Sequence, residues 1–301
     1  MKKLLLVVLT ALVTAPAMAA DLAPRVHRRP VAVVAPFSWT GFYVGANIGG
    51  AWENTETNYS YVSTPVSGGF ESVFGTGGPL NVPGLSAVAS AIAQGFLPTS
   101  LGSRHPGVFT AGGQLGYNVQ INQLVLGAEA DINWLSGGVR TTSYAASVSA
   151  PQPVGTLTNT DTQSAGLRWI GTVRGRLGLA VNRALFYATG GLAYGQAVAS
   201  SSGIVLDNGR NPDLYLGDAS GLRTGYTVGG GLEYAVTNNL TIRGEYLYYN
   251  LGTATYAVAA ANALAAGEGL YITGSQKFDG SLVRFGLNYK FGNYYAPVVT
   301  K

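Results

Sequence analysis

Eight charged residues lie where they could pair inside a folded chain. Four are acidic and four are basic: Glu129, Asp131, Glu233, Glu245, Arg174, Arg176, Arg243 and Arg284. Each sits in a segment where polar and apolar residues alternate, which directs the polar ones to one face of a strand. The balance of signs predicts a neutral network of buried ion pairs. A proton or ion path along this network, or catalysis, are the alternative interpretations.

Residues for other kinds of chemistry are scarce. The chain has no cysteine and only two histidines, His27 and His105, so it offers neither a cysteine-based metal motif nor a histidine triad on a rigid frame. Asp207, Asp213 and Asp218 could bind a divalent cation, although solvated carboxylates are the commoner case. We therefore predict no enzymatic activity, no metal and no cofactor.

The N-terminus has the pattern of an export signal. Two lysines precede an apolar run, Leu4 to Val13, and Ala17-Met18-Ala19 fits a cleavage site. The run is shorter than the roughly 20 residues that a spanning helix needs. We predict a signal peptide over 1–19 and a periplasmic linker over 20–38, which contains three prolines. Without Lys2 and Lys3, 16 basic residues face 14 acidic ones, a balance that gives no indication of nucleic-acid binding.

The composition is unusual for a water-soluble domain. Charged residues make up 11% of the chain, whereas about 25% is typical. After the signal, no apolar run is long enough for a helix to cross a bilayer, and a closed β-barrel is the other structure that can do so. A barrel wall that faces lipid also accounts for the shortage of charge.

Alternation of period two recurs eight times and predicts the strands that would hold the charges. Their approximate ranges are 41–52, 108–120, 124–134, 167–180, 185–195, 225–236, 240–249 and 281–291. In the fourth range we expect Arg168 to point inward with Arg174 and Arg176. The fold class is therefore all-β, an eight-stranded antiparallel transmembrane barrel over 39–291, followed by a C-terminal extension over 292–301.

The connections alternate between short and long. Asn-rich turns at 122–123, 181–183 and 237–239 separate long connections at 53–107, 135–166, 196–223 and 250–280. This order is typical of bacterial barrels, whose short turns are periplasmic and whose long loops are extracellular. Leu85, Val88, Ala89, Ile92 and Phe96 have helical spacing in the first long loop, and Ala257 to Ala266 could form a second short helix.

The four tryptophans lie near the ends of the predicted strands. Trp39 precedes the first strand on the periplasmic side, and Trp52, Trp134 and Trp169 adjoin long loops. Tryptophan concentrates at membrane interfaces, so we expect all four in the two aromatic girdles of the barrel.

Several segments resemble the small outer-membrane β-barrel family of Gram-negative bacteria, which is also called the porin family and includes opacity-type and haemin-binding surface proteins. The resemblance rests on WTGFYVGANIGGAW at 39–52, GAEADINW at 127–134, YATGGLAY at 187–194, RGEYLY at 243–248 and VRFGLNYKF at 283–291. It implies eight strands and a last strand that closes on an aromatic residue, here Phe291, although ten residues follow it.

From these features we expect a structural, surface-exposed protein of the cell outer membrane. A small passive channel and loop-mediated adhesion or haem binding, with His105 as the axial ligand, are the alternatives. The expected partners are outer-membrane lipids including lipopolysaccharide, the barrel assembly machinery and an extracellular ligand bound through the loops.

Overall fold

The computed structural model describes residues 37–64, 73–75, 78–81, 83, 86–149, 155–207, 210–262 and 269–292. The predicted signal peptide, most of the linker and all of the C-terminal extension except Gly292 lie outside these residues and remain predictions. The described elements are β1 (Gly41–Asn54), β2 (Thr57–Ser63), α2 (Ala87–Ala93), β3 (Ser100–Leu101), β4 (Arg104–Ile121), β5 (Leu124–Ser136), β6 (Arg140–Ser149), β7 (Thr156–Val181), β8 (Ala184–Asp207), β9 (Arg210–Asp218), β10 (Gly221–Ala235), β11 (Leu240–Ala260) and β12 (Leu270–Lys290).

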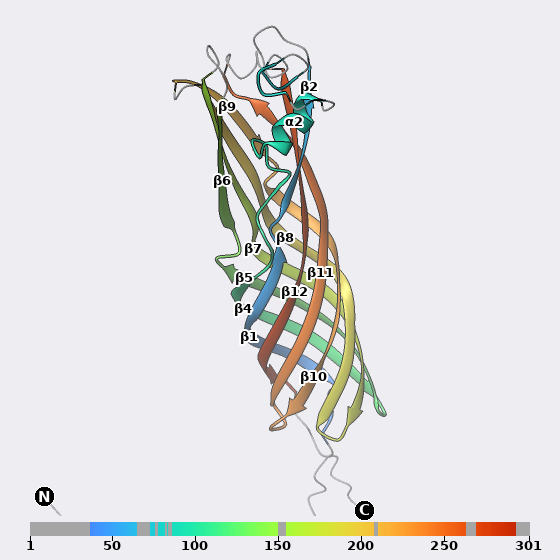
Figure 1. Ribbon diagram of the computed structural model, residues 1–301. Helices are drawn as coiled ribbons and strands as arrows, with labels where there is room; N and C mark the ends of the chain where they lie inside the picture. Colours follow the sequence, from blue (N-terminus) through green and yellow to red (C-terminus); the bar gives the residue numbers. More distant parts are fainter. Residues whose placement is uncertain are drawn as a thin grey trace, which may run out of the picture. The chain divides into compact units, whose positions relative to one another are not determined.

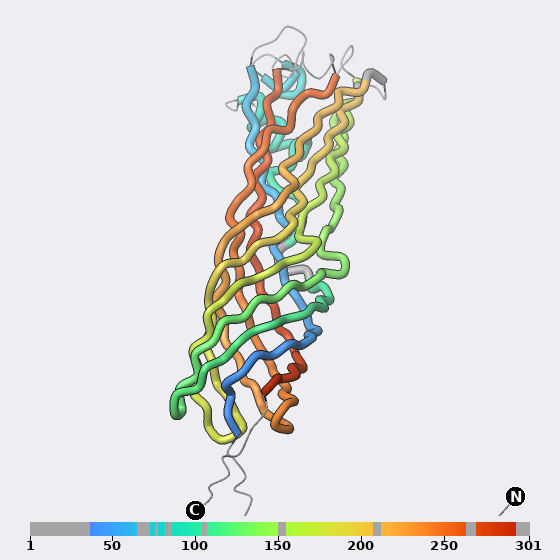
Figure 2. Tube along the Cα trace, turned by 180° about the vertical axis from the view of Figure 1, so that it is seen from behind, coloured from blue at the N-terminus to red at the C-terminus, as the bar shows by residue number. Residues whose placement is uncertain are grey.

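Eight of these strands form a closed antiparallel ring. Going round it, β1 pairs with β4, β4 with β5, β5 with β7, β7 with β8, β8 with β10, β10 with β11, β11 with β12, and β12 with β1. The strands are tilted as they wind around the ring (Figures 1 and 2). The predicted eight-stranded β-barrel is confirmed.

Alternation sets the two faces of the wall, as predicted. In β1, Phe42, Val44 and Ile48 are exposed on the outside, whereas Tyr43 and Asn47 are buried inside. Two of the predicted turns contain an asparagine at φ 55°, Asn122 and Asn182, in the left-handed region that asparagine tolerates.

Three of the four long connections, 135–166, 196–223 and 250–280, are mostly strands rather than loops, and 53–107 contains β2, β3 and α2, which corrects the predicted ranges. β7 and β8 continue as one hairpin to Leu157 and Asp207, and β11 and β12 pair as far as Val258 and Ile272. β2, β3, β6 and β9 join these extended strands (Figure 1). We call this part the outer extension, and the part between the tight turns and Trp52, Trp134 and Trp169 the turn-side region. On β6 and β7 many outward residues of the outer extension are Ser or Thr, so these strands lack the apolar signal of a lipid-facing strand.

A β-bulge in β7 overturns the predicted orientation of Arg168. Leu167 pairs with Ala197 and Ile170 with Gly195, so two residues of β7 oppose one of β8. The extra residue reverses the alternation, as bulges do. Arg168 is consequently exposed, while Leu167 and Ile170 both point inward and are buried.

One of the two predicted short helices is present. α2 occupies Ala87–Ala93 and is capped by Ser86, whose hydroxyl accepts from the Ala89 N–H at 3.3 Å. The prediction of the second helix is wrong for residues 257–260, which belong to β11. Residues 263–266 lie outside the described part, so there it stays a prediction. No helix among the described residues is long and apolar enough to cross a membrane.

Candidate functional site

The barrel interior brings all eight predicted charges together in the turn-side region. Arg174 is at the centre of this charge network: its guanidinium lies 2.5 Å from Glu129, 2.8 Å from Asp131 and 3.0 Å from Glu245. Its Nε also donates to the hydroxyl of Thr172 at 2.9 Å. One guanidinium thus joins three carboxylates that come from β5 and β11.

The other three arginines extend this network to further strands. Arg243 lies 2.5 Å from Glu129, and Arg176 lies 2.8 Å from Glu233. Arg284 lies 3.0 Å from Asp131 and also pairs with Glu245. The side chains of all eight residues are at most 3% exposed. Paired charges of this kind replace an apolar core in the turn-side region, where the outside is apolar.

Two tyrosines belong to the network although they were not predicted as site residues. The Tyr43 hydroxyl donates to Glu129 at 2.6 Å and accepts from Arg176 at 2.8 Å. The Tyr187 hydroxyl donates to Glu245 at 3.0 Å, and its ring centroid lies 3.9 Å from the guanidinium carbon of Arg176. The sequence could have indicated both tyrosines, because each occupies an inward position in the alternation of its strand.

Trp39 closes the turn end of the interior and is not in the girdle where we predicted it. Its side chain is 1% exposed and packs with Val125, Leu185 and Tyr187. Its backbone N–H donates to the Gln120 side chain at 2.7 Å, and the Phe37 ring meets its ring edge-on at 5.0 Å. Trp39 lies before β1, where the chain is free to fold under the barrel, so its side chain fills the opening.

The inward residues of β7 show how the interior is filled beyond the charge network. Leu167 and Ile170 come next and belong to an apolar cluster with Leu247, Phe278 and Leu282. Asn159, Asp161 and Gln163 follow as a polar layer, and Leu157 packs against a second apolar cluster at the outer end. Both clusters consist of buried side chains, so described residues occupy the interior at each of these levels along β7.

The outer apolar cluster forms a cap under α2. Its buried members are Phe74, Leu80, Ala87, Ala91, Phe96, Leu97 and Leu270. Below it, a cavity of about 20 Å³ is lined by Tyr59, Tyr61 and Asp161 among others. That volume holds about one water molecule. Burial raises the pKa of Asp161 to about 6, and the Asn159 amide, which donates to it at 2.7 Å, acts in the opposite direction.

Three of the four tryptophans do face outward at the outer limit of the turn-side region. Trp52 is 40% exposed, Trp134 is 57% exposed, and Trp169 is partly exposed with its ring 6.0 Å from that of Tyr194. That these three lie in a membrane interface remains a prediction.

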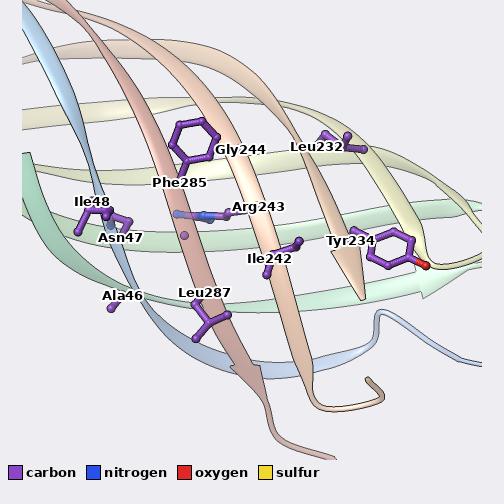
Figure 3. A pocket seen from close by; sticks show the side chains of 11 residues that line it. Ala46, Asn47, Ile48, Leu232, Tyr234, Ile242, Arg243, Gly244, Phe285 and Leu287 are labelled. Atoms are coloured by element: carbon purple, nitrogen blue, oxygen red, sulfur yellow. The ribbon is translucent and has the colours of Figure 1, made fainter. Parts of the chain in front are cut away.

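The outside of the turn-side region carries a shallow apolar groove of about 650 Å³ over β1, β12, β11 and β10 (Figure 3). Ala46 and Gly244 leave the space, and Phe285, Leu287 and Ile242 border it. The groove lies on the wall that faces lipid, so it is not an entrance to the interior.

Within the described part of the chain, the other candidate residues do not gather into a metal site. Among the described residues, no group of three or more His, Asp or Glu is placed to hold a metal ion. The side chains of His105 and Asp207 lie outside the described part, and the carboxylate of Asp218 accepts from the Ser220 hydroxyl at 2.7 Å.

Comparisons with known proteins agree with this architecture. A family model described as the outer membrane protein beta-barrel domain matches residues 5–291. The 31 kDa outer-membrane immunogenic protein of Brucella melitensis is 33% identical over 302 residues, covering 97% of this chain and all of the relative. The 22 kDa outer membrane protein of Rhizobium leguminosarum is 31% identical over 186 residues, covering 60% of this chain and 66% of the relative.

Among solved structures, Neisserial surface protein A is similar with a TM-score of 0.33 and 13% identity, over 84% of this chain and 98% of its own. OprG from Pseudomonas aeruginosa gives a TM-score of 0.34 and 10% identity, over 85% and 99%. The family match over nearly the whole chain, the Brucella relative and the closed ring of eight strands lead to one conclusion: this chain belongs to the outer-membrane β-barrel family and is a protein of the outer membrane.

Proposed function

We propose that this protein is a closed structural barrel that displays its outer extension at the cell surface and conducts no solutes. The observation that carries the proposal is the filled interior: Trp39 at the turn end, then the charge network, an apolar cluster, a polar layer and the cap. An eight-stranded barrel is only wide enough for its own side chains, which agrees with this filling.

Conductance through a planar bilayer tests closure directly. We expect no conductance steps from the refolded protein, because an ion would have to pass both apolar clusters and the paired charges. A Trp39→Gly variant should stay closed too, since the remaining layers lie above it. Steady single-channel steps from the wild-type protein would contradict the proposal and favour the small passive channel.

The proposed display at the surface is supported by the chemistry of the outer extension. Its outward residues include a series of hydroxyls, and its outer end encloses an apolar cluster under α2, as in a domain surrounded by water. Relatives from Brucella carry the name immunogenic outer-membrane protein. We therefore expect intact cells to be labelled by an antibody against the β6–β7 hairpin, and labelling only after permeabilisation would count against display.

The proposal includes the absence of enzymatic activity. It is supported by the sequence, which has only His27 and His105 and no cysteine. The alternative of haem binding requires His105 as the axial ligand. If the His105→Ala variant binds haem as the wild type does in a titration, His105 is not that ligand.

Phe291 is the residue through which we propose recognition by the barrel assembly machinery. Its N–H donates to the Phe42 carbonyl at 2.8 Å, so it continues the pairing of β12 with β1, and its ring lies 5.0 Å from that of Tyr289. We expect Phe291→Ala to reduce the amount of folded protein in the outer membrane, whereas deletion of 293–301 leaves it unchanged. The opposite result would move recognition to the extension.

A further inference from the structure

Strand β6 forms an edge of the sheet in the outer extension (Figure 1). One side of it pairs with β7 over its whole length. On the other side, its first residue, Arg140, donates to the Gly107 carbonyl of β4 at 3.2 Å. From Thr141 onward, the described residues show no backbone hydrogen bond between this side and another segment. Alternate residues of β6 therefore point their N–H and C=O groups away from β7, and we call this side the free edge.

The exposure of the β6 side chains also shows that the free edge is open. None of its ten residues is buried. The outward residues are exposed, and the inward ones are partly exposed: Thr142, Tyr144, Ala146 and Val148. The Tyr144 hydroxyl donates to the Gly95 carbonyl, so the segment after α2 contacts an inward side chain of β6 and leaves its backbone free.

The sequence of β6 lacks the devices that usually protect the edge of a sheet. Proteins block such edges with charged residues, proline, bulges or very short strands. Residues 141–149 contain no charge and no proline, and their ladder with β7 has no register shift. An edge of this kind can accept an extended strand through its backbone groups.

The outward side chains of β6 are arranged symmetrically about Ala145. Two hydroxyl residues lie on each side of it: Thr141 and Ser143 before it, and Ser147 and Ser149 after it. In an antiparallel pair of two β6 strands with Ala145 opposite Ala145, each of these hydroxyls lies opposite a hydroxyl. Each is already within 3.4 Å of a hydroxyl of β7. Because a hydroxyl has one donor and two acceptor sites, it can take the second partner as well.

The inward side chains fit together in the same register. Tyr144 of one strand lies opposite Ala146 of the other, so a large side chain meets a small one. Thr142 lies opposite Val148, and both are β-branched, which favours cross-strand packing. Since residues 141–149 are uncharged, no like charges meet. The strand is thus complementary to a second copy of itself, as an interface with twofold symmetry requires.

We propose that the free edge of β6 binds the free edge of a second copy of this protein in a facing membrane. A twofold axis that makes two strands antiparallel is perpendicular to both of them. The strands of the outer extension run lengthwise along the barrel (Figures 1 and 2), so the two barrels of such a pair point in opposite directions. The protein is therefore its own ligand in contacts between cells.

A single contact of this kind is weak. It joins nine residues of each copy along one strand edge, which is less than the roughly 800 Å² per partner of a stable complex. Two facing membranes carry many copies, and linked contacts strengthen binding by about a hundredfold or more. We therefore expect the protein to join membranes under conditions in which it stays monomeric in detergent.

The test measures the joining of lipid vesicles that carry the refolded protein. Two vesicle populations with different dyes are mixed, without lipopolysaccharide, and the joined pairs are counted. The inference rests on the proposed display at the cell surface, which antibody labelling of intact cells tests separately. Wild-type vesicles that do not join would overturn the inference and leave display untouched.

Ala145 provides the decisive variants, because in the proposed register it lies opposite itself. Vesicles that carry only A145K, or only A145E, should join about tenfold less than wild type, since like charges then face each other. A mixture of A145K vesicles with A145E vesicles should join again, because opposite charges meet. The matched control is Ala257→Lys, at an exposed alanine of β11 that is not part of the free edge, and it should join as wild type does.

Three results with these variants would contradict the proposal. Unchanged joining by A145K and A145E would show that the edge is not the contact, and an equal loss in Ala257→Lys would indicate general charge repulsion. A mixture of A145K and A145E vesicles that stays apart would show that Ala145 does not meet itself. All variants are first checked for folding by their heat-dependent shift on SDS gels.

The distance between joined membranes tests the antiparallel arrangement itself. Two β6 strands that overlap fully hold the membranes apart by the length of one strand, about 30 Å for ten residues. Electron cryo-microscopy of joined wild-type vesicles should show this gap. A gap of about twice that length would mean that the barrels meet end to end and that β6 is not the site of contact.

Discussion

Strand β7 passes through two regions of the barrel that are built in opposite ways. In the turn-side region, Arg174 and Arg176 point inward while Val173 and Leu177 face outward. In the outer extension, the inward positions carry no arginine and combine the apolar Leu157 with the uncharged amides of Asn159 and Gln163 and the carboxyl of Asp161, while the outward positions are threonines and serines. The change occurs at the bulge around Arg168 and Trp169.

The surroundings of the wall explain the reversal. Lipid tails are as apolar as leucine, so an apolar side chain gains little by moving from the lipid side to the interior, and paired charges can occupy that interior. Where water surrounds the wall, burying apolar surface is again favourable, and apolar clusters form inside on both sides of the polar layer. The same strand therefore passes from lipid in the turn-side region to water in the outer extension. We expect substitutions in the two regions to change the stability of the protein in different ways.

The largest expected effect is in the charge network of the turn-side region. Arg174→Met leaves Glu129, Asp131 and Glu245 without their shared partner, and removal of one member from buried ion pairs costs about 3–5 kcal/mol. Urea unfolding in detergent micelles, followed by tryptophan fluorescence, measures the loss. The matched control is Arg168→Met on the same strand, an exposed site where the change should stay within about 0.5 kcal/mol. Equal losses at the two sites would show that the network adds nothing to stability.

The next largest effect should be confined to the outer extension. Phe96→Ala empties the centre of the cap, where the Phe96 ring lies 5.2 Å from that of Phe74, and such truncations cost about 3 kcal/mol. We expect faster proteolysis of the outer extension with an unchanged heat-dependent gel shift, because the ring below does not depend on the cap. The control is Val62→Ala, an exposed position of β2. Loss of the gel shift would show that the two regions fold as one unit.

A smaller effect should appear as a dependence on pH. Since the pKa of Asp161 is about 6 in the fold and its usual value is 3.8, the folded protein holds the proton more tightly than the unfolded chain. The stabilisation is therefore complete below about pH 4, is lost as the pH rises to 6, and changes little above that. Melting of the outer extension by near-UV circular dichroism at pH 4 and pH 7 should show this loss in the wild type. Asp161→Asn should reduce the difference and Asp218→Asn should not; the same difference in all three proteins would rule out Asp161 as its source.

The sequence predicted the structure correctly where a strand faces lipid along its whole length and its alternation is unbroken. Alternation located the ring strands and the eight network charges, because an apolar outer face and polar inner face repeat over each range. Arg168 was misplaced because a single extra residue reverses the alternation without any change in composition. The sequence predicts loops where the outer extension stands, because Ser200 and Thr162 face water and carry no apolar signal. The pairing of β7 with β8 there depends on both strands and cannot be recognised in the sequence of one.

The smallest effect separates Trp39 from the outward tryptophans and concerns spectra rather than stability. Variants that keep a single tryptophan, with the other three changed to Phe, are reconstituted in lipid brominated near the head group, which quenches only tryptophans in contact with lipid. Trp134 is 57% exposed on the outer wall and should be strongly quenched, whereas Trp39 is 1% exposed under the barrel and should keep its emission. Strong quenching of Trp39 would return it to a periplasmic girdle and leave the turn end of the interior open. The closed state would then depend on the charge network, the polar layer and the two apolar clusters, and the conductance of the wild-type protein would show whether these layers suffice.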